Sequence, residues 1–167
     1  MATITYRPTA TGDAAAHSVT GANNHTALND NLDTTYIRNN TGTLLEDDLN
    51  ITDTALTSET IDSIDVRFRA RSETTPAGEV AVGLRLSSTN SMATTQTAIP
   101  TSATDYTKTA IARPGGGSWV VADLNALQVV VQSNDTTAAG VRIFEVFVDV
   151  NYTASSVLTF SPKIIIY

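Results

Sequence analysis

The feature of this sequence that most constrains its fold is an alternation of apolar and polar residues with a period of two. The segment IDVRFRAR places Ile64, Val66, Phe68 and Ala70 on one face of an extended chain and arginines on the other. The segment EVAVGLRL repeats the pattern, and helical periodicity is almost absent. Because successive side chains of a strand point to opposite faces of a sheet, the alternation predicts strands with one buried face.

The longest predicted strand is RIFEVFVDVNY. One face is predicted to hold Phe144, Val146, Val148, Val150 and Tyr152. The other face mixes Ile143, Glu145, Phe147, Asp149 and Asn151. The segment LQVVVQS is short and fully apolar, which suits a central strand.

Turn signals separate these segments, namely TPAGE, RPGGGS and SNDTTAAG. Weaker strand candidates are ATITY, TTYIR, the region 106–111 and KIIIY. Roughly seven to nine short strands of this kind predict an all-β fold, an antiparallel β-sandwich of the jelly-roll type. One helical turn is predicted near 121–126, with Asp123 as its cap. We expect one sandwich domain, 1–152, which includes an N-terminal arm, followed by a C-terminal arm or strand extension, 153–167.

Charge and composition exclude several classes of protein. The formal net charge of −7 is the opposite of the basic footprint that non-specific nucleic-acid binding needs. No apolar run approaches the roughly 18 residues of a membrane span, and no signal peptide is recognisable, so we expect synthesis in a host cytoplasm. Charged residues make up 16% of the chain, against about 25% in typical soluble proteins. Threonine replaces them, which suits strand surfaces and also surface that becomes buried in an assembly.

The only tryptophan, Trp119, follows the glycine run of RPGGGSW. Its predicted place is the open end of the sandwich, where it covers the edge of the core. The alternative is an exposed ring on which a ligand stacks. The glycines before it allow backbone angles that residues with a Cβ atom resist.

Two acidic segments are candidates for metal binding. The segment ALNDNLDTTY carries Asp30 and Asp33, oxygen donors of the kind that calcium prefers, although Asx-rich loops more often bond to their own backbone. The segment LLEDDLNITD is interpreted as a solvated turn, with a metal as the less favoured alternative. No other cofactor is predicted.

No catalytic motif emerges. Nothing singles out a pair of carboxylates of the kind that glycosidases use. The only histidines, His17 and His25, have no nucleophile motif nearby, so a Ser/His/Asp site finds no support. We therefore expect a protein that is not an enzyme.

Arg67, Arg69 and Arg71 project from one strand face at i, i+2 spacing. The favoured interpretation pairs them across strands with Glu145 and Asp149 of the same chain. The alternative is contact with an acidic neighbouring subunit.

Both ends of the sequence are apolar arms that need a partner strand. An exposed apolar edge promotes aggregation, so each arm must pair with its own sheet or with another subunit. The residues assigned to a subunit interface under the second alternative are Ile4, Tyr6, Ile164, Ile165, Ile166 and Tyr167.

Four segments in order, LNDNLDTTYI, IDSIDVRFRAR, SWVVADLNALQVVV and RIFEVFVDVNY, resemble a domain found in bacteriophage structural proteins and related bacterial open reading frames. The resemblance covers about 6–152 and leaves the last fifteen residues outside it. It implies a jelly-roll-like sandwich on the exterior of a virion, and it carries over no catalytic residue.

The function expected from this resemblance is capsid decoration. In this interpretation the chain binds the major capsid protein on the outer capsid surface, as a homotrimer, and stiffens the shell through arms at each end of the sandwich. The alternative is a carbohydrate- or receptor-binding module of a tail fibre or appendage, with Trp119, Tyr36 or Tyr106 as stacking platforms. A plain structural domain of a tail or head fibre is a third interpretation.

Overall fold

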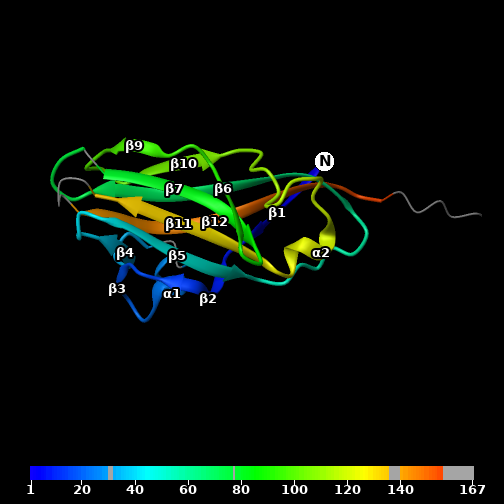
Figure 1. Ribbon diagram of the computed structural model, residues 1–167, viewed down its shortest axis with the longest axis horizontal. Coiled ribbons are helices and arrows are strands. Elements are labelled where there is room, and N and C mark those ends of the chain that lie inside the picture. The colour runs from blue at the N-terminus through cyan, green and yellow to red at the C-terminus, as the bar shows by residue number, and fades with distance from the viewer. Residues whose placement is uncertain (30–31, 77, 136–139, 156–167) are drawn as a thin grey trace, which may run out of the picture.

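Two antiparallel sheets pack face to face, which confirms the predicted all-β sandwich (Figure 1). The computed structural model describes residues 1–29, 32–76, 78–135 and 140–155. Sheet A contains β10 (Thr104–Lys108), β6 (Thr60–Ser72), β12 (Val141–Thr153), β4 (Tyr36–Asn39) and β3 (Ser18–Thr20) in that spatial order, and β1 (Ala2–Tyr6) pairs with β12 beside β4. Sheet B contains β2 (Pro8–Ala15), β5 (Leu44–Ile51), β11 (Leu127–Asn134), β7 (Gly78–Leu86) and β8 (Thr89–Met92), and β9 (Gln96–Ile99) also pairs with β7. Two short helices are α1 (Asn24–Ala27) and α2 (Val121–Leu124).

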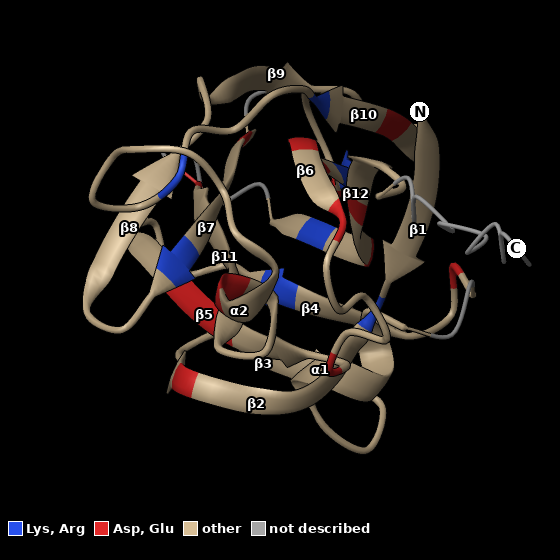
Figure 2. Ribbon diagram, turned by 90° about the vertical axis from the view of Figure 1, so that its right-hand side faces the viewer, with Lys and Arg blue, Asp and Glu red and all other residues tan. Residues whose placement is uncertain are grey.

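The connectivity is that of a jelly roll, as predicted. Strand β4 pairs with β12, β5 with β11, β6 with β10 and β7 with β8, so the pairs are nested like the two arms of one long hairpin. Two further pairs, β6 with β12 and β7 with β11, hold the rolled hairpin closed. Successive strands from β4 to β7 alternate between the sheets, which gives two closely packed layers (Figure 2).

The core between the sheets confirms the predicted inward faces of two strands. On β6 the side chains of Ile64, Val66, Phe68 and Ala70 are at most 2% exposed. On β7 the side chains at 80, 82 and 84 are fully buried, whereas Leu86 is only partly buried. Burial of each large apolar side chain contributes about 1.5–3 kcal/mol to the hydrophobic stabilisation of the core.

The N-terminal segment belongs to the chain's own sheet. Strand β1 pairs with β12 from Ala2 opposite Tyr152 to Tyr6 opposite Val148. The Tyr6 side chain is buried in the core, with its hydroxyl hydrogen-bonded to Thr54, and Ile4 packs against the same core. Of the two alternatives for this arm, pairing within the chain therefore holds, and a subunit contact at Ile4 or Tyr6 stays a prediction.

A β-bulge changes the predicted faces of β12. The pairing with β6 shifts register between Ile143 and Glu145. Ile143 therefore joins the core with Val146, whereas Phe144 turns to the outer face of sheet A, although the alternation placed Phe144 with Val146. There Phe144 lies edge-on to Tyr36, with ring centroids 5.8 Å apart, and remains only 1% exposed.

Two of the three arginines of β6 form ion pairs within the chain, and the pair between Arg67 and Asp149 is the predicted one. Arg67 donates two hydrogen bonds to Asp149, at 2.5 and 3.1 Å. Arg69 pairs with Asp33 and Asp105 instead of Glu145. Arg71 lies 5.9 Å from the Phe144 ring centroid.

The outer-face position of Phe144 is testable. We expect Phe144→Ala to reduce the free energy of unfolding by about 3–5 kcal/mol, because the ring is buried although it lies on the outer face of sheet A. Val19→Ala, at a side chain that is 37% exposed, is the matched control and should change stability by less than about 0.5 kcal/mol. Chemical denaturation of both variants measures the difference, and equal small effects would contradict the assigned packing.

Candidate functional site

The most distinctive hollow lies where β10 separates from β6. The two strands pair only as far as Lys108 opposite Val66. The chain then turns away at Ala110, whose φ is +51°, and its last backbone contact with β6 is the bond from Ile111 N to Ile64 O, at 2.9 Å. Within the described residues, 60–63 of β6 therefore have no neighbouring strand on this side.

The loop that follows is held rigidly. Arg113 forms a two-pronged ion pair with Asp123, at 2.8 and 2.9 Å, and also donates to the carbonyl of Gly116, at 3.0 Å. The guanidinium keeps the pKa of Asp123 below its usual value. Asp123 accepts the backbone N–H of Val120 at the start of α2, so the predicted helical turn with Asp123 as its capping side chain is confirmed.

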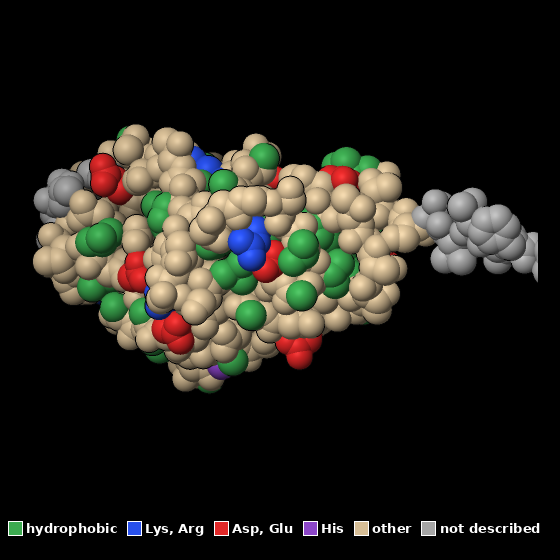
Figure 3. All heavy atoms as spheres, turned by 45° about the vertical axis from the view of Figure 1, so that its right-hand side comes forward, with side chains coloured by type: hydrophobic (Ala, Val, Ile, Leu, Met, Phe, Trp, Pro, Cys, Tyr) green, Lys and Arg blue, Asp and Glu red, His purple; other side chains and the backbone are tan. Residues whose placement is uncertain are grey.

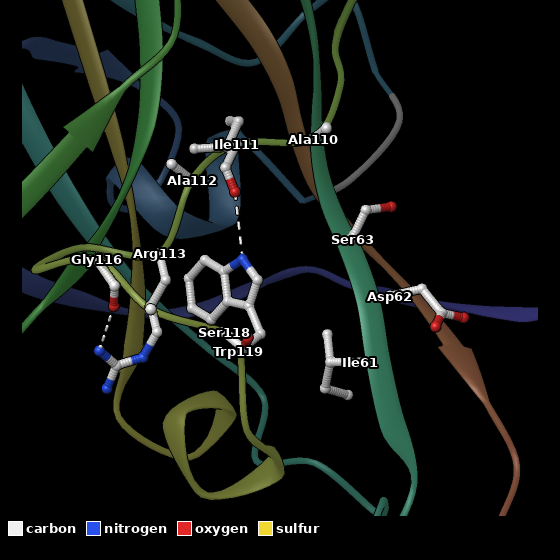
Figure 4. Close-up of a pocket in the computed structure, with 11 residues that line it drawn as sticks. Ile61, Asp62, Ser63, Ala110, Ile111, Ala112, Arg113, Gly116, Ser118 and Trp119 are labelled. Atoms are coloured by element: carbon white, nitrogen blue, oxygen red, sulfur yellow. Dashed lines mark hydrogen bonds between the residues drawn. The ribbon is translucent and has the colours of Figure 1, made fainter.

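Trp119 forms the wall of the hollow opposite β6 (Figure 4). The indole is partly buried against the core, and its Nε1 donates to the carbonyl of Ile111, at 3.2 Å. This confirms the position at the core edge, and it also leaves part of the ring facing an open hollow of about 370 Å³. Residues 61–63, 110–113 and 116–119 line the hollow, which we call the Trp119 groove.

The rim of the groove combines apolar and polar groups. Ile61 and Ile111 are buried at its floor, and Asp62 is exposed at its edge. Gly116 and Gly117 adopt φ values of +84° and +77°, which glycine tolerates and other residues resist, so the backbone on this side carries no Cβ atoms. The groove therefore offers an indole ring and one carboxylate to a ligand.

The structure also brings together three residues that the sequence separates widely. The Nε2 atom of His17 lies 2.6 Å from Ser133 Oγ, and its Nδ1 lies 3.2 Å from Asp47 Oδ1. This order of nucleophile, base and carboxylate is that of a catalytic triad. However, the His17 and Asp47 side chains have no exposed area, and Ser133 is 1% exposed.

Because a substrate cannot reach Ser133 Oγ in this arrangement, the three residues act as a buried polar network. Asp47 of β5 accepts the backbone N–H groups of Ala16 and His17, at 2.6 and 3.1 Å, and the side-chain amide of Asn24 in α1. Burial raises the pKa of Asp47, but the hydrogen bonds from His17 and Asn24 outweigh it and hold the pKa below its usual value. The network joins the N-terminal segment to β5 and β11.

Of the two candidate calcium ligands, the structure describes only Asp33. Both of its carboxylate oxygens accept hydrogen bonds from Arg69, at 2.8 and 2.9 Å, and Asp30 lies outside the described residues. Across the part of the chain that is described, no group of three or more His, Asp or Glu side chains is placed to hold a metal ion.

The second acidic segment divides between the two faces of sheet B. Asp47 points inward to His17, whereas Glu46 and Asp48 face outward toward Arg85 of β7, which also contacts Asp13. Asp48 is fully buried under this cluster, and burial raises its pKa. The cluster therefore serves to link β2, β5 and β7 across the outer face.

The two tyrosines proposed as stacking platforms contact other rings or charges of the chain. Tyr106 stacks on Phe68, with ring centroids 5.0 Å apart, and Tyr36 lies between Phe144 and Arg142. Trp119 is thus the better ligand platform of the three. Ile164, Ile165, Ile166 and Tyr167 lie outside the described residues.

Comparisons with known proteins assign the chain to no family. No protein-family description and no curated protein matches the sequence. Among known structures, the chain is similar to the enzymatically active domain of tailspike protein 4 from bacteriophage CBA120, with 13% sequence identity and a TM-score of 0.47. The match covers 89% of this chain and 19% of the tailspike chain. No helix in the described residues is long and apolar enough to cross a membrane.

The buried network predicts a pH-dependent loss of stability. Because the folded-state pKa of Asp47 lies below its unfolded value, the carboxylate stabilises the fold above about pH 4, and this contribution is lost as the pH falls through the folded-state pKa. We expect Asp47→Asn to reduce the free energy of unfolding by about 1–3 kcal/mol at pH 7 and by less at pH 3.

Chemical denaturation of both proteins at a series of pH values measures this difference. Asp53→Asn, at an exposed carboxylate, is the matched control and should change little at any pH. A difference between Asp47→Asn and the unmodified chain that stays constant from pH 7 to pH 3 would contradict the role of the charge.

Proposed function

We propose that this chain is a non-enzymatic structural module of a bacteriophage virion, and that it binds a neighbouring component through the Trp119 groove. The observation that carries the proposal is the partly exposed Trp119 ring, fixed by Ile111 and facing a sheet edge without a strand. The resemblance of four sequence segments to a domain of phage structural proteins supports the virion location. The surface is poor in charge, which suits burial in an assembly (Figure 3).

Within the virion we favour a tail appendage over the capsid surface. The decoration mechanism expected from the sequence needs arms at opposite ends of the sandwich. Instead, Ala2 pairs with Tyr152, so the start of β1 and the end of β12 lie side by side at the end that also carries α2 (Figure 1). A module with one binding end suits attachment within an appendage better than bridging between capsomers.

Co-sedimentation tests the location. The purified chain is mixed separately with tails and with empty mature shells of the phage that encodes it, each prepared without the chain. We expect saturable binding to tails and none to shells at micromolar protein. Saturable binding to shells at a fixed ratio to the major capsid protein would instead establish capsid decoration, and a ratio of three copies per site would support the trimer. Binding to neither particle would overturn the proposal.

Carbohydrate binding at the same groove is the second candidate. It is favoured by the juxtaposition of the Trp119 ring with the polar rim formed by Asp62, Ser63 and Ser118. As the only tryptophan, Trp119 reports binding directly through its fluorescence.

Under this candidate, an oligosaccharide of the receptor type should shift or quench the emission in a saturable way, and Ala112→Arg, which fills the open side of the groove from an exposed position, should weaken binding about tenfold or more. Leu32→Asp, at a 51% exposed side chain away from the groove, is the matched control. No response across a broad glycan panel would exclude this candidate.

A further inference from the structure

We propose that the Trp119 groove accepts residues 163–167 (KIIIY) of a second copy of this chain, as an added antiparallel strand on the free edge of β6. The inference rests on the proposed function, because it names the partner of the same site. The neighbouring component at the groove is then another copy of this chain, whereas the location of the module in the virion is a separate part of the proposed function.

The site is a sheet edge prepared for one more strand. Strand β6 spans thirteen residues and β10 only five, so β10 covers β6 from Val66 to Ala70 and leaves 60–63 uncovered on that side. The loop that carries Trp119, residues 110–119, lies apart from this edge, and the groove is the space between them (Figure 4). An extended segment in the groove would gain backbone hydrogen bonds from β6 and apolar contact with the indole, which is how strand addition binds peptides.

The chain itself carries a segment suited to this edge. Residues 164–167 are three isoleucines and a tyrosine, all strong strand formers, and such a segment is an aggregation hazard unless it pairs. The segment 156–167 contains Lys163 and no acidic residue, whereas Asp62 stands on the rim of the groove. The charge of the segment therefore complements that of its proposed site.

The path of the last described residues leads toward the groove. The hydroxyl of Thr153 donates to Asp62, at 2.8 Å, and the hydroxyl of Ser155 donates to the carbonyl of Ser58. The chain thus leaves β12 at the start of β6, beside the residues that line the groove. Twelve further residues follow Ser155, and at about 3.3 Å per extended residue they can reach well beyond their own molecule.

The direction of the strands favours a second copy, and not the same molecule, as the source of the added strand. Strand β12 runs antiparallel to β6 and ends opposite Thr60, the first residue of β6. A segment that turned back from this point onto the same molecule would run parallel to β6, and parallel pairs are slightly less stable per residue. A segment that arrives from another copy can approach in the antiparallel sense. Reciprocal exchange would close a dimer, and head-to-tail exchange would close a ring such as a trimer.

Sedimentation of the full chain over a concentration series tests the proposal, with Trp119 fluorescence recorded on the same samples. We expect the unmodified chain to associate, with a shift in Trp119 emission that follows the associated fraction. Ile165→Asp places a charge on the apolar segment, and Ala112→Arg fills the groove on the other partner. Each should weaken association about tenfold or more, because a buried charge or a blocked groove removes the apolar contact.

Leu32→Asp, which removes an exposed apolar side chain outside the groove, is the matched control and should associate like the unmodified chain. Thermal unfolding by circular dichroism confirms that each variant remains folded. If Ile165→Asp and Ala112→Arg each associated over the same concentration range as the unmodified chain, the proposal would be overturned. A monomer at every concentration whose Trp119 emission changes on Ile165→Asp would show that the segment binds its own molecule, which also overturns it.

The same variants separate this inference from the proposed function. If the chain associates through the segment but binds neither tails nor shells, the contact between copies stands and the virion location fails. If tails bind the unmodified chain and both variants associate with copies of themselves as well as the unmodified chain does, the location stands and the exchanged strand fails.

Discussion

The pairing of β6 with β12 is the contact on which the rest of the fold depends. Each strand is thirteen residues long, and together they form the centre of sheet A. Their inward side chains, among them Ile64, Val66 and Val148, supply the core, and the ion pair between Arg67 and Asp149 joins their outer faces. Because β6 belongs to the first half of the nested hairpin and β12 to the second, this pair closes the roll, and the bulge in β12 brings Phe144 to the outer face.

The N-terminal strands are added to this roll and need their own attachments. Strand β1 is held by β12, whereas the connection from β2 to β3 is held by the buried network of His17, Asp47 and Ser133. Burial of these polar groups would be costly without partners, and each finds them in a different element. The triad-like geometry thus follows from the packing of the N-terminal segment against β5 and β11. Ser133 is buried, so a substrate cannot reach its hydroxyl group in this arrangement.

The Trp119 groove arises from unequal strand lengths. A sheet in which β10 matched β6 along its whole length would have no free edge at 60–63, and Trp119 would then cover only the core. The departure of β10, the glycine turn and the ion pair between Arg113 and Asp123 together hold the loop away from the sheet. Assembly through this edge would also remove the aggregation hazard that an unpaired strand edge presents.

Local periodicity along the chain was enough to predict several features of the fold. Alternation identified the inward faces of β6 and β7 and the all-β class, and Asp123 marked the helical turn. The same alternation places Ser133 on the inward face of β11 with Val129 and Val131. A polar residue predicted to be buried needs a partner, and this signal could have pointed to the network with His17. Three features became visible only in the folded chain, namely the bulge at Phe144, the ion pair that engages Asp33 and the free edge beside Trp119. These features depend on which distant strands become neighbours and where their pairing stops, and a period of two along one strand contains no information about its partner.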